Sequence, residues 1–103
     1  MAVALVQEFP VDRSGDRTTT NYDAIQERLD TKNNPPQGGI FNCAGFDEEA
    51  GVFRIFAVWE TKEDAERFLR ERVMPAVAEV TGRDENAGPP HQHFYELHDL
   101  MTR

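Results

Sequence analysis

The sequence predicts an α+β fold whose elements follow the order β-α-β-β-α-β. Three observations lead to this prediction: short apolar runs typical of strands, two longer segments with apolar residues at helical spacing, and turn-forming residues between them. At 103 residues the chain is close to the commonest size of a domain, so residues 1–103 are expected to form a single domain.

Four segments have the composition of strands. Residues 3–9 alternate between the two faces of a strand and are followed by a proline. Residues 40–46 and 52–59 are rich in β-branched and aromatic side chains, and the short acidic segment between them ends at Gly51, which is typical of a hairpin. The last strand is expected over residues 92–101.

The third of these strands, residues 52–59, is the most apolar stretch of the chain. Such a nearly continuous apolar run, interrupted by Arg54 alone, is typical of a central strand that is covered on both faces. Arg54 is expected either to pair with an acidic neighbour or to lie at an interface between chains. Cys43, in the preceding strand, is expected to be a small buried hydrophobic residue, because no histidine base is predicted beside it.

Two segments have helical periodicity. The first begins within residues 18–21, which supply candidate N-caps, places Tyr22, Ile25 and Leu29 on one face, and ends near Thr31. The second begins after the N-cap Thr61 and ends at Gly82, with a kink or break expected near Met74 because Pro75 follows. Its apolar face is formed by Ala65, Phe68, Leu69, Val73, Ala76, Val77 and Val80.

This order of elements is the split βαβ pattern of ferredoxin-like folds, in which two helices cover one face of a four-stranded antiparallel sheet. The other face of the sheet would then remain open and apolar. A homodimer that joins the open faces of two copies is the expected closure, which makes the predicted architecture a dimeric α/β barrel.

Several short motifs, taken together, resemble the antibiotic biosynthesis monooxygenase-like family of dimeric α/β barrels. They are Tyr22-Asp23-Ala24-Ile25, Gly38-Gly39-Ile40-Phe41-Asn42-Cys43-Ala44-Gly45, Val58-Trp59-Glu60-Thr61-Lys62-Glu63, and Phe68-Leu69 with Met74-Pro75-Ala76-Val77. The resemblance implies the fold and the homodimer. It does not imply one chemistry, since similar barrels include cofactor-free monooxygenases, isomerases, cyclases, haem enzymes and proteins of no known activity.

The chain departs from its relatives at two positions. Relatives often carry a histidine where this chain has Asn42 and an aspartate where it has Ala57. By strand parity Ala57 and Trp59 share a face, so a polar pair that would line the space between sheet and helices is expected to be missing. An acid-base role borrowed from that pair is therefore not expected here.

The candidate ligand pocket combines a phenol, an amide and two aromatic side chains. Tyr22, Asn42, Trp59 and Phe68 could hold a planar aromatic or polyketide-like ligand by stacking and a few hydrogen bonds, and His93 is a further candidate. The alternative interpretation is ordinary core packing, because any small core requires aromatic residues at such spacing.

His91 and His93 are spaced to lie on one face of a strand, with Glu96 and His98 nearby in sequence, and could share a metal ion. The alternative is that they lie in a solvated, proline-rich loop. Three histidines without a clustered carboxylate favour the second interpretation, so no metal site is predicted. No haem or other cofactor is predicted either.

Charge and hydropathy exclude several classes of partner. Nineteen acidic and eleven basic side chains give a formal charge of −8, which disfavours nucleic acid and anionic lipid surfaces. No run approaches the ~18 apolar residues of a membrane span, and residues 1–6 lack the basic flank of a signal peptide. The cytoplasm is the expected location, in agreement with the single cysteine.

Three functions remain open at this point. The first is a cofactor-independent monooxygenase for a small aromatic or polyketide-like substrate, which would supply the electrons itself as a stabilised carbanion that reacts with oxygen. The second is an isomerase or cyclase with Tyr22 or His93 as proton carrier. The third is a non-catalytic protein that binds a small ligand or a partner, and the missing histidine and aspartate favour it.

Overall fold

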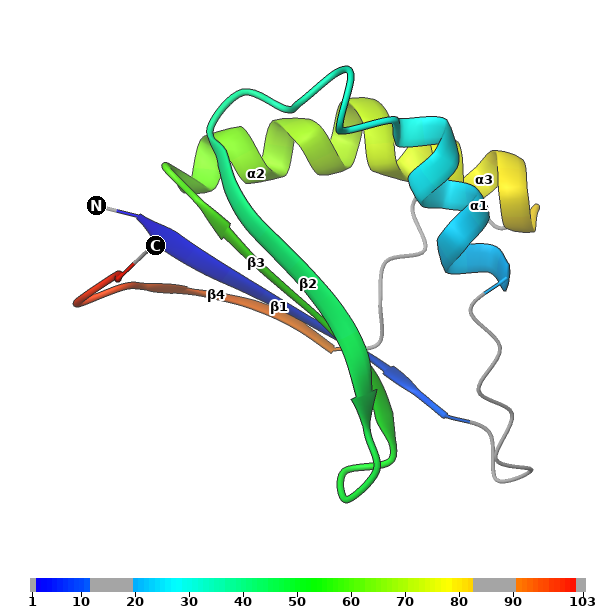
Figure 1. The fold of residues 1–103 in the computed structure, drawn as a ribbon, viewed down its shortest axis with the longest axis horizontal. Helices are drawn as coiled ribbons and strands as arrows, with labels where there is room; N and C mark the ends of the chain where they lie inside the picture. The colour runs from blue at the N-terminus through cyan, green and yellow to red at the C-terminus, as the bar shows by residue number, and fades with distance from the viewer. Residues whose placement is uncertain (1, 12–19, 83–90, 102–103) are drawn as a thin grey trace.

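The computed structural model describes residues 2–11, 20–82 and 91–101. Their elements are β1 (Val3–Pro10), α1 (Thr20–Leu29), β2 (Gly39–Asp47), β3 (Val52–Trp59), α2 (Lys62–Phe68), the π-helical turn η1 (Leu69–Val73), α3 (Met74–Thr81) and β4 (His91–Glu96). The strands form one antiparallel sheet in the order β2-β3-β1-β4, and the helices lie on one side of it (Figure 1). The predicted ferredoxin-like α+β fold is confirmed. The candidate caps Thr18 and Thr19 lie outside the described residues.

The central strand is β3, as its apolar composition predicts. It pairs with β1 on one side and with β2 on the other, so that Ala57 lies opposite both Leu5 and Asn42. Arg54 is paired, since its guanidinium donates hydrogen bonds to the carboxylates of Glu8 and Asp47. The prediction of an acidic partner for Arg54 is therefore confirmed.

The helix predicted over residues 61–82 is divided into three segments. It begins as predicted, because the Oγ1 atom of Thr61 accepts the backbone N–H of Asp64 at 3.1 Å. Pro75 has no N–H for the preceding turn, and that turn widens so that the N–H of Met74 reaches the carbonyl of Leu69. Gly82 ends the helix in the left-handed conformation, with φ of 72°.

Two predicted ends differ from the structure, the end of α1 by two residues and the end of β4 by five. Helix α1 ends at Leu29, because Asp30 adopts φ of 47° and turns the chain. Strand β4 spans His91–Glu96 and not residues 92–101. Within the described residues β4 pairs with β1 alone, and β1 begins at Val3. The ladder therefore ends where the N–H of Leu97 donates to the carbonyl of Ala2, and residues 98–101 pair with no described strand.

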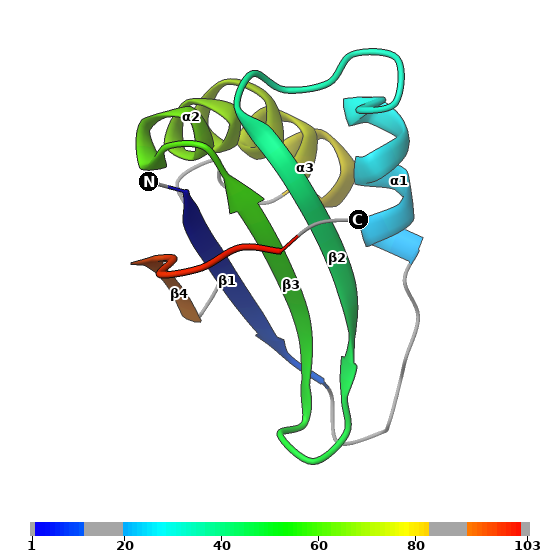
Figure 2. The same ribbon diagram turned by 60° about the vertical axis from the view of Figure 1, so that its left-hand side comes forward.

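The face of the sheet without helices is largely apolar at one end. Phe41 of β2 and Tyr95 of β4 are 52% and 45% exposed there, at opposite edges of the sheet, and Cys43 is exposed on the same strand as Phe41. The prediction that Cys43 is buried is wrong for the single chain, because β2 is an edge strand and this side chain points away from the helices. Figure 2 shows the C-terminal segment, in red, passing in front of β1 and β3, and Ala4 and Val58 of this face are buried.

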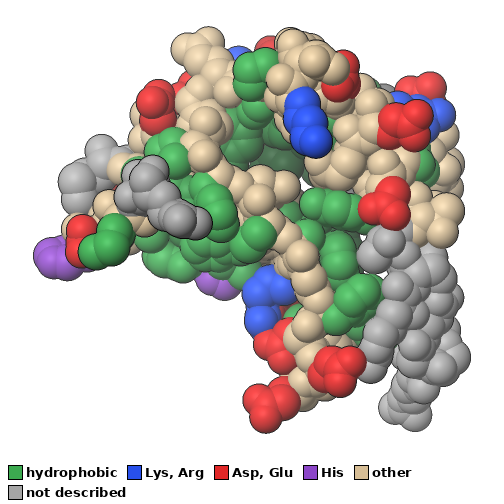
Figure 3. Space-filling model, viewed as in Figure 1, with side chains coloured by type: hydrophobic (Ala, Val, Ile, Leu, Met, Phe, Trp, Pro, Cys, Tyr) green, Lys and Arg blue, Asp and Glu red, His purple; other side chains and the backbone are tan. Residues whose placement is uncertain are grey.

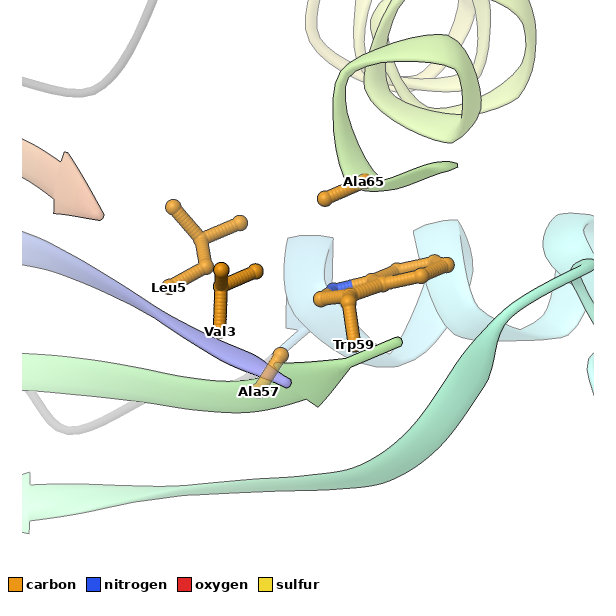
Figure 4. Packing of buried hydrophobic residues seen from close by; sticks show 5 residues of the cluster. All are labelled: Val3, Leu5, Ala57, Trp59 and Ala65. Carbon is orange, nitrogen blue, oxygen red and sulfur yellow. The ribbon is translucent and has the colours of Figure 1, made fainter. Parts of the chain in front are cut away.

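The helix-facing side of the sheet is packed at one end. Val3 and Leu5 of β1, Ala57 and Trp59 of β3, and Ala65 of α2 form the buried cluster (Figure 4). Helix α2 covers this end, whereas α1 packs chiefly against α3 and η1. The other end of the same surface is therefore left without close helical cover.

Candidate functional site

A cavity of about 670 Å³ lies between the sheet and the helical layer. Figure 3 shows the molecule hollowed there, with hydrophobic side chains gathered in the hollow. The floor comes from β1, β2 and β3, and the roof comes from α1, η1 and α3. The volume falls within the ~300–1,000 Å³ of typical small-molecule sites, so the space is large enough for a ligand of several rings.

The strand register explains why the floor is deep. Ala57 lies in the middle of the floor, between Leu5 of β1 and Asn42 of β2. Its methyl group is the smallest side chain that could stand there apart from glycine, and Ile55 follows it along β3 on the same face. Ala57 is buried, and its small side chain deepens the floor of the cavity at this position.

Tyr22 of α1 reaches across the cavity to the sheet. Its ring meets Phe53 edge to face at 5.3 Å between centroids, and its phenol forms a hydrogen bond with the Asn42 side chain. Burial raises the pKa of Tyr22, and this effect outweighs the opposite effect of the Asn42 hydrogen bond. At neutral pH the cavity therefore contains a protonated phenol, which is able to donate a hydrogen bond to a ligand.

Trp59 and Phe68 form the aromatic wall at the packed end of the cavity. Their ring centroids lie 5.3 Å apart with the planes tilted by 44°. Trp59 is buried and is the chain's only tryptophan, so its fluorescence reports on this cavity alone. The Arg72 guanidinium lies over the ring of Phe68. It also donates hydrogen bonds to the backbone carbonyls of Leu29 and Asn34.

The described residues that line the cavity carry no formal charge. Among the described residues that line it there is no Asp, Glu, Lys, Arg or His, and Tyr22 is the one titratable side chain in that set. The remaining polar lining residues are the amides and hydroxyls of Gln7, Asn21, Gln26, Thr31, Asn42 and Thr81, together with the Trp59 indole. The protein as a whole has a net charge of −8, so a lining without charged residues stands out from the rest of the chain. Such a lining favours a neutral ligand, because it offers a charged one no partner.

The structure brings together four of the five predicted site residues. Tyr22, Asn42, Trp59 and Phe68 all line the cavity, whereas His93 does not. His93 lies opposite Val6 on the other face of the sheet, where its ring stacks near Tyr95 with centroids 6.0 Å apart.

His91 and His93 do share one face, but they belong to β4 and not to a loop. Within residues 2–11, 20–82 and 91–101, no three His, Cys, Asp or Glu side chains gather closely enough to hold a metal ion. None of the helices in this part of the chain has the length and apolar character that a membrane span requires.

Sequence reasoning missed Gln7, a polar residue on the floor of the cavity. Its side chain is 9% exposed, and its Nε2 atom donates to Oε1 of Gln92 at 2.8 Å. A signal was present, since Gln7 interrupts the apolar alternation of Val3, Leu5 and Phe9 on the face that becomes the core. A glutamine at such a position needs a partner or a ligand.

Comparison with known proteins supports the fold. No protein-family model matches the chain, and no curated protein sequence matches it. Several solved structures are similar to the chain along nearly its whole length, and each of the following three covers 99% of it. A protein from Chloroflexus aurantiacus assigned to the antibiotic biosynthesis monooxygenases has a TM-score of 0.62 at 15% identity over 98% of its own chain. SnoaB, a cofactor-independent oxygenase from Streptomyces nogalater, has a TM-score of 0.64 at 12% sequence identity, and the match covers 98% of its chain. Rv0793 from Mycobacterium tuberculosis has a TM-score of 0.64 at 10% sequence identity, and the match covers its full chain.

The chain therefore has the ferredoxin-like α+β fold of the antibiotic biosynthesis monooxygenase-like proteins, and the predicted resemblance is confirmed at the level of the fold. At identities of 10–15% this likeness carries the architecture and not the chemistry.

The raised pKa of Tyr22 gives a direct test of the site. In a Tyr95→Phe variant Tyr22 is the one remaining tyrosine. Its phenolate absorbance, followed near the ultraviolet maximum, should appear with a midpoint above the ordinary value of about 10, because burial disfavours the charged form. Adding Asn42→Leu should move the midpoint further up, because the hydrogen bond that lowers the pKa is then lost. A midpoint at or below about 10 in the folded Tyr95→Phe protein would contradict this environment.

Proposed function

We propose that the cavity binds a small, neutral aromatic or polyketide-like molecule, and that the protein oxidises it as a cofactor-independent monooxygenase. The observation that carries this proposal is the uncharged cavity with one hydrogen-bonded phenol and amide opposite an aromatic wall. The fold of SnoaB, which is a cofactor-independent oxygenase, adds support.

The chemistry follows from what the lining offers. A substrate with a methylene group between aromatic rings and conjugated to a carbonyl loses a proton to water and becomes a delocalised enolate. That enolate passes electrons to dioxygen and a peroxide forms at the same carbon. Loss of water then leaves a ketone, so that CH2 and O2 become C=O and H2O. Both oxygen atoms and all electrons are accounted for without an added reductant.

Four of the lining residues have a role in this reaction. The Tyr22 O–H donates to the substrate oxygen on which the enolate charge collects, and its raised pKa keeps that proton in place. Asn42 orients the phenol through their hydrogen bond. Trp59 and Phe68 hold the rings by stacking, and the apolar lining residues contact the rest of the substrate.

Non-catalytic binding of a ligand is the second candidate. It is favoured by the lack of a carboxylate or imidazole among the described lining residues, because the reaction above then depends on water as the base. An isomerase or cyclase is less well supported, since His93 lies on the other face and Tyr22 is a neutral donor instead of a base.

Oxygen consumption with an anthrone as substrate tests the proposal. The wild-type protein should consume one O2 per anthrone and release the quinone, with no metal or flavin added. Tyr22→Phe and Asn42→Ala should each lower kcat/KM by about tenfold to a hundredfold, because each removes stabilisation of the developing oxyanion. The melting temperature of Asn42→Ala should stay nearly unchanged, because Asn42 is exposed at the edge strand.

The matched controls are Tyr95→Phe, on the other face of the sheet, and Asn34→Ala, an exposed amide outside the cavity lining. Both should retain wild-type rates. Binding of the quinone without oxygen uptake would assign the protein to non-catalytic ligand binding. Unfolding of Asn42→Ala would contradict the placement of this amide at a solvent-accessible mouth.

We also propose that residues 1–103 form one domain that pairs with a second copy through the face of the sheet without helices, as a dimeric α/β barrel. Phe41, Cys43 and Tyr95 are exposed on that face in the single chain, and Phe41 and Phe56 contact each other there at 6.3 Å between ring centroids. A cytoplasmic location is kept as part of the proposal, on the ground of the free Cys43.

The dimer is tested by light scattering on the eluting protein. The wild type should have about twice the chain mass of 11.7 kDa at micromolar concentration. Cys43→Asp should shift the protein toward the monomer, because two carboxylates would be buried in the interface, whereas Cys43→Ser should remain dimeric. Cys43 is exposed in the single chain, so both variants should fold. A monomeric wild-type protein would overturn the proposal.

A further inference from the structure

We infer that Gln7 is a second polar subsite at the inner end of the cavity, where it selects ligands that present a neutral group able both to donate and to accept a hydrogen bond. A hydroxyl or a primary amide on an aromatic ring has this chemistry, and a carboxylate does not. The inference rests on the proposed function in one respect, namely that the cavity binds an aromatic ligand.

The Gln7 amide is buried with unused hydrogen-bonding capacity. The side chain is 9% exposed and lines the cavity. In the described part of the chain its amide makes one hydrogen bond, from Nε2 to Oε1 of Gln92 at 2.8 Å. One N–H and the Oε1 atom of Gln7 are left over. These two atoms have no partner among the described residues and are not sealed from the cavity, so they are available to a ligand.

The two polar sites lie at opposite ends of the cavity floor. Asn42 is on the edge strand β2 and is exposed, which puts the Tyr22–Asn42 pair at the mouth. Gln7 is on β1, which is separated from β2 by β3, and two strand separations amount to about 10 Å. The floor between them carries Ala57 and Ile55. A ligand of two or three fused rings would cover this floor and meet a polar group at each end.

The charge of the lining decides which polar group is accepted. The hydrogen bond to Gln92 restrains the Gln7 amide, whose second N–H and Oε1 atom have no partner among the described residues. A carboxylate at this place would meet the Gln7 acceptor and would have no cation among the described lining residues. The net charge of −8 adds a repulsive field. The Gln7 subsite is therefore expected to accept a ligand with a neutral amide and to reject a ligand of nearly the same size with a carboxylate.

Quenching of Trp59 fluorescence by three anthraquinones at pH 7 tests the inference. The probes are the unsubstituted ring system, the 2-carboxamide and the 2-carboxylate, and the last two are nearly equal in size. The wild-type protein should bind the carboxamide at least about tenfold more tightly than the carboxylate. Gln7→Leu should weaken carboxamide binding by roughly fivefold to tenfold and leave the unsubstituted probe nearly unchanged.

Two further variants support the reading of this experiment. Gln37→Leu, the same substitution at an exposed position outside the cavity, should change none of the affinities. Gln92→Leu should fold even if Gln7→Leu does not, because Gln92 is exposed. It frees the Gln7 amide to rotate and should reduce the preference for the carboxamide.

The outcomes separate the two proposals. If no probe quenches Trp59, the cavity does not bind aromatic ligands, and both the proposed function and the Gln7 subsite are wrong. If the carboxamide and the carboxylate bind equally, or if neither Gln7→Leu nor Gln92→Leu alters the preference, the Gln7 subsite is wrong while ligand binding by the cavity stands.

Discussion

The packing of α2 on the end of β3 is the interaction on which the rest of the structure depends. Trp59 is buried under Ala65 and beside Phe68, and this contact fastens the helical layer to one end of the sheet. Because α1 and α3 then pack against each other, the far end of the same surface has no close cover. The cavity is the consequence, and its depth follows from the small side chain of Ala57 at its floor.

Much of this could be read from the sequence, because periodicity reports local geometry. The alternation of residues 3–9, the apolar run of 52–59 and the Thr61 cap predict β1, β3 and the start of α2. The extent of β4 depends on where its neighbour ends, and the exposure of Cys43 depends on which strand lies at the edge, so neither follows from local pattern. Strand parity and helix periodicity predict four residues of the cavity lining, Tyr22, Asn42, Trp59 and Phe68. The size of the hollow does not follow from local pattern, since it arises from helices that pack on each other.

The two faces of the sheet have different chemistry, and the difference explains why they are assigned different roles. The helix side holds an uncharged cavity with a protonated Tyr22, suited to a neutral molecule. On the other side, the guanidinium of Arg54 bridges Glu8 and Asp47 at one end, while Phe41 and Tyr95 are exposed at the other. Hydrogen bonds from the Ala50 N–H and then from Arg54 lower the pKa of Asp47, so this ion pair persists at neutral pH. A charged end and an apolar end suit contact with a second protein surface.

The hollow between the sheet and the helical layer is proposed to be a ligand-binding cavity. The most direct measurement is a crystal structure of the protein grown with a neutral three-ring aromatic ligand. The account predicts electron density for one ligand per chain, with its rings over Ala57 and Ile55 and its polar ends near Asn42 and Gln7. Density for the ligand on the other face of the sheet, or a chain in which Tyr22 and Phe53 have closed over the floor and left no space, would contradict it.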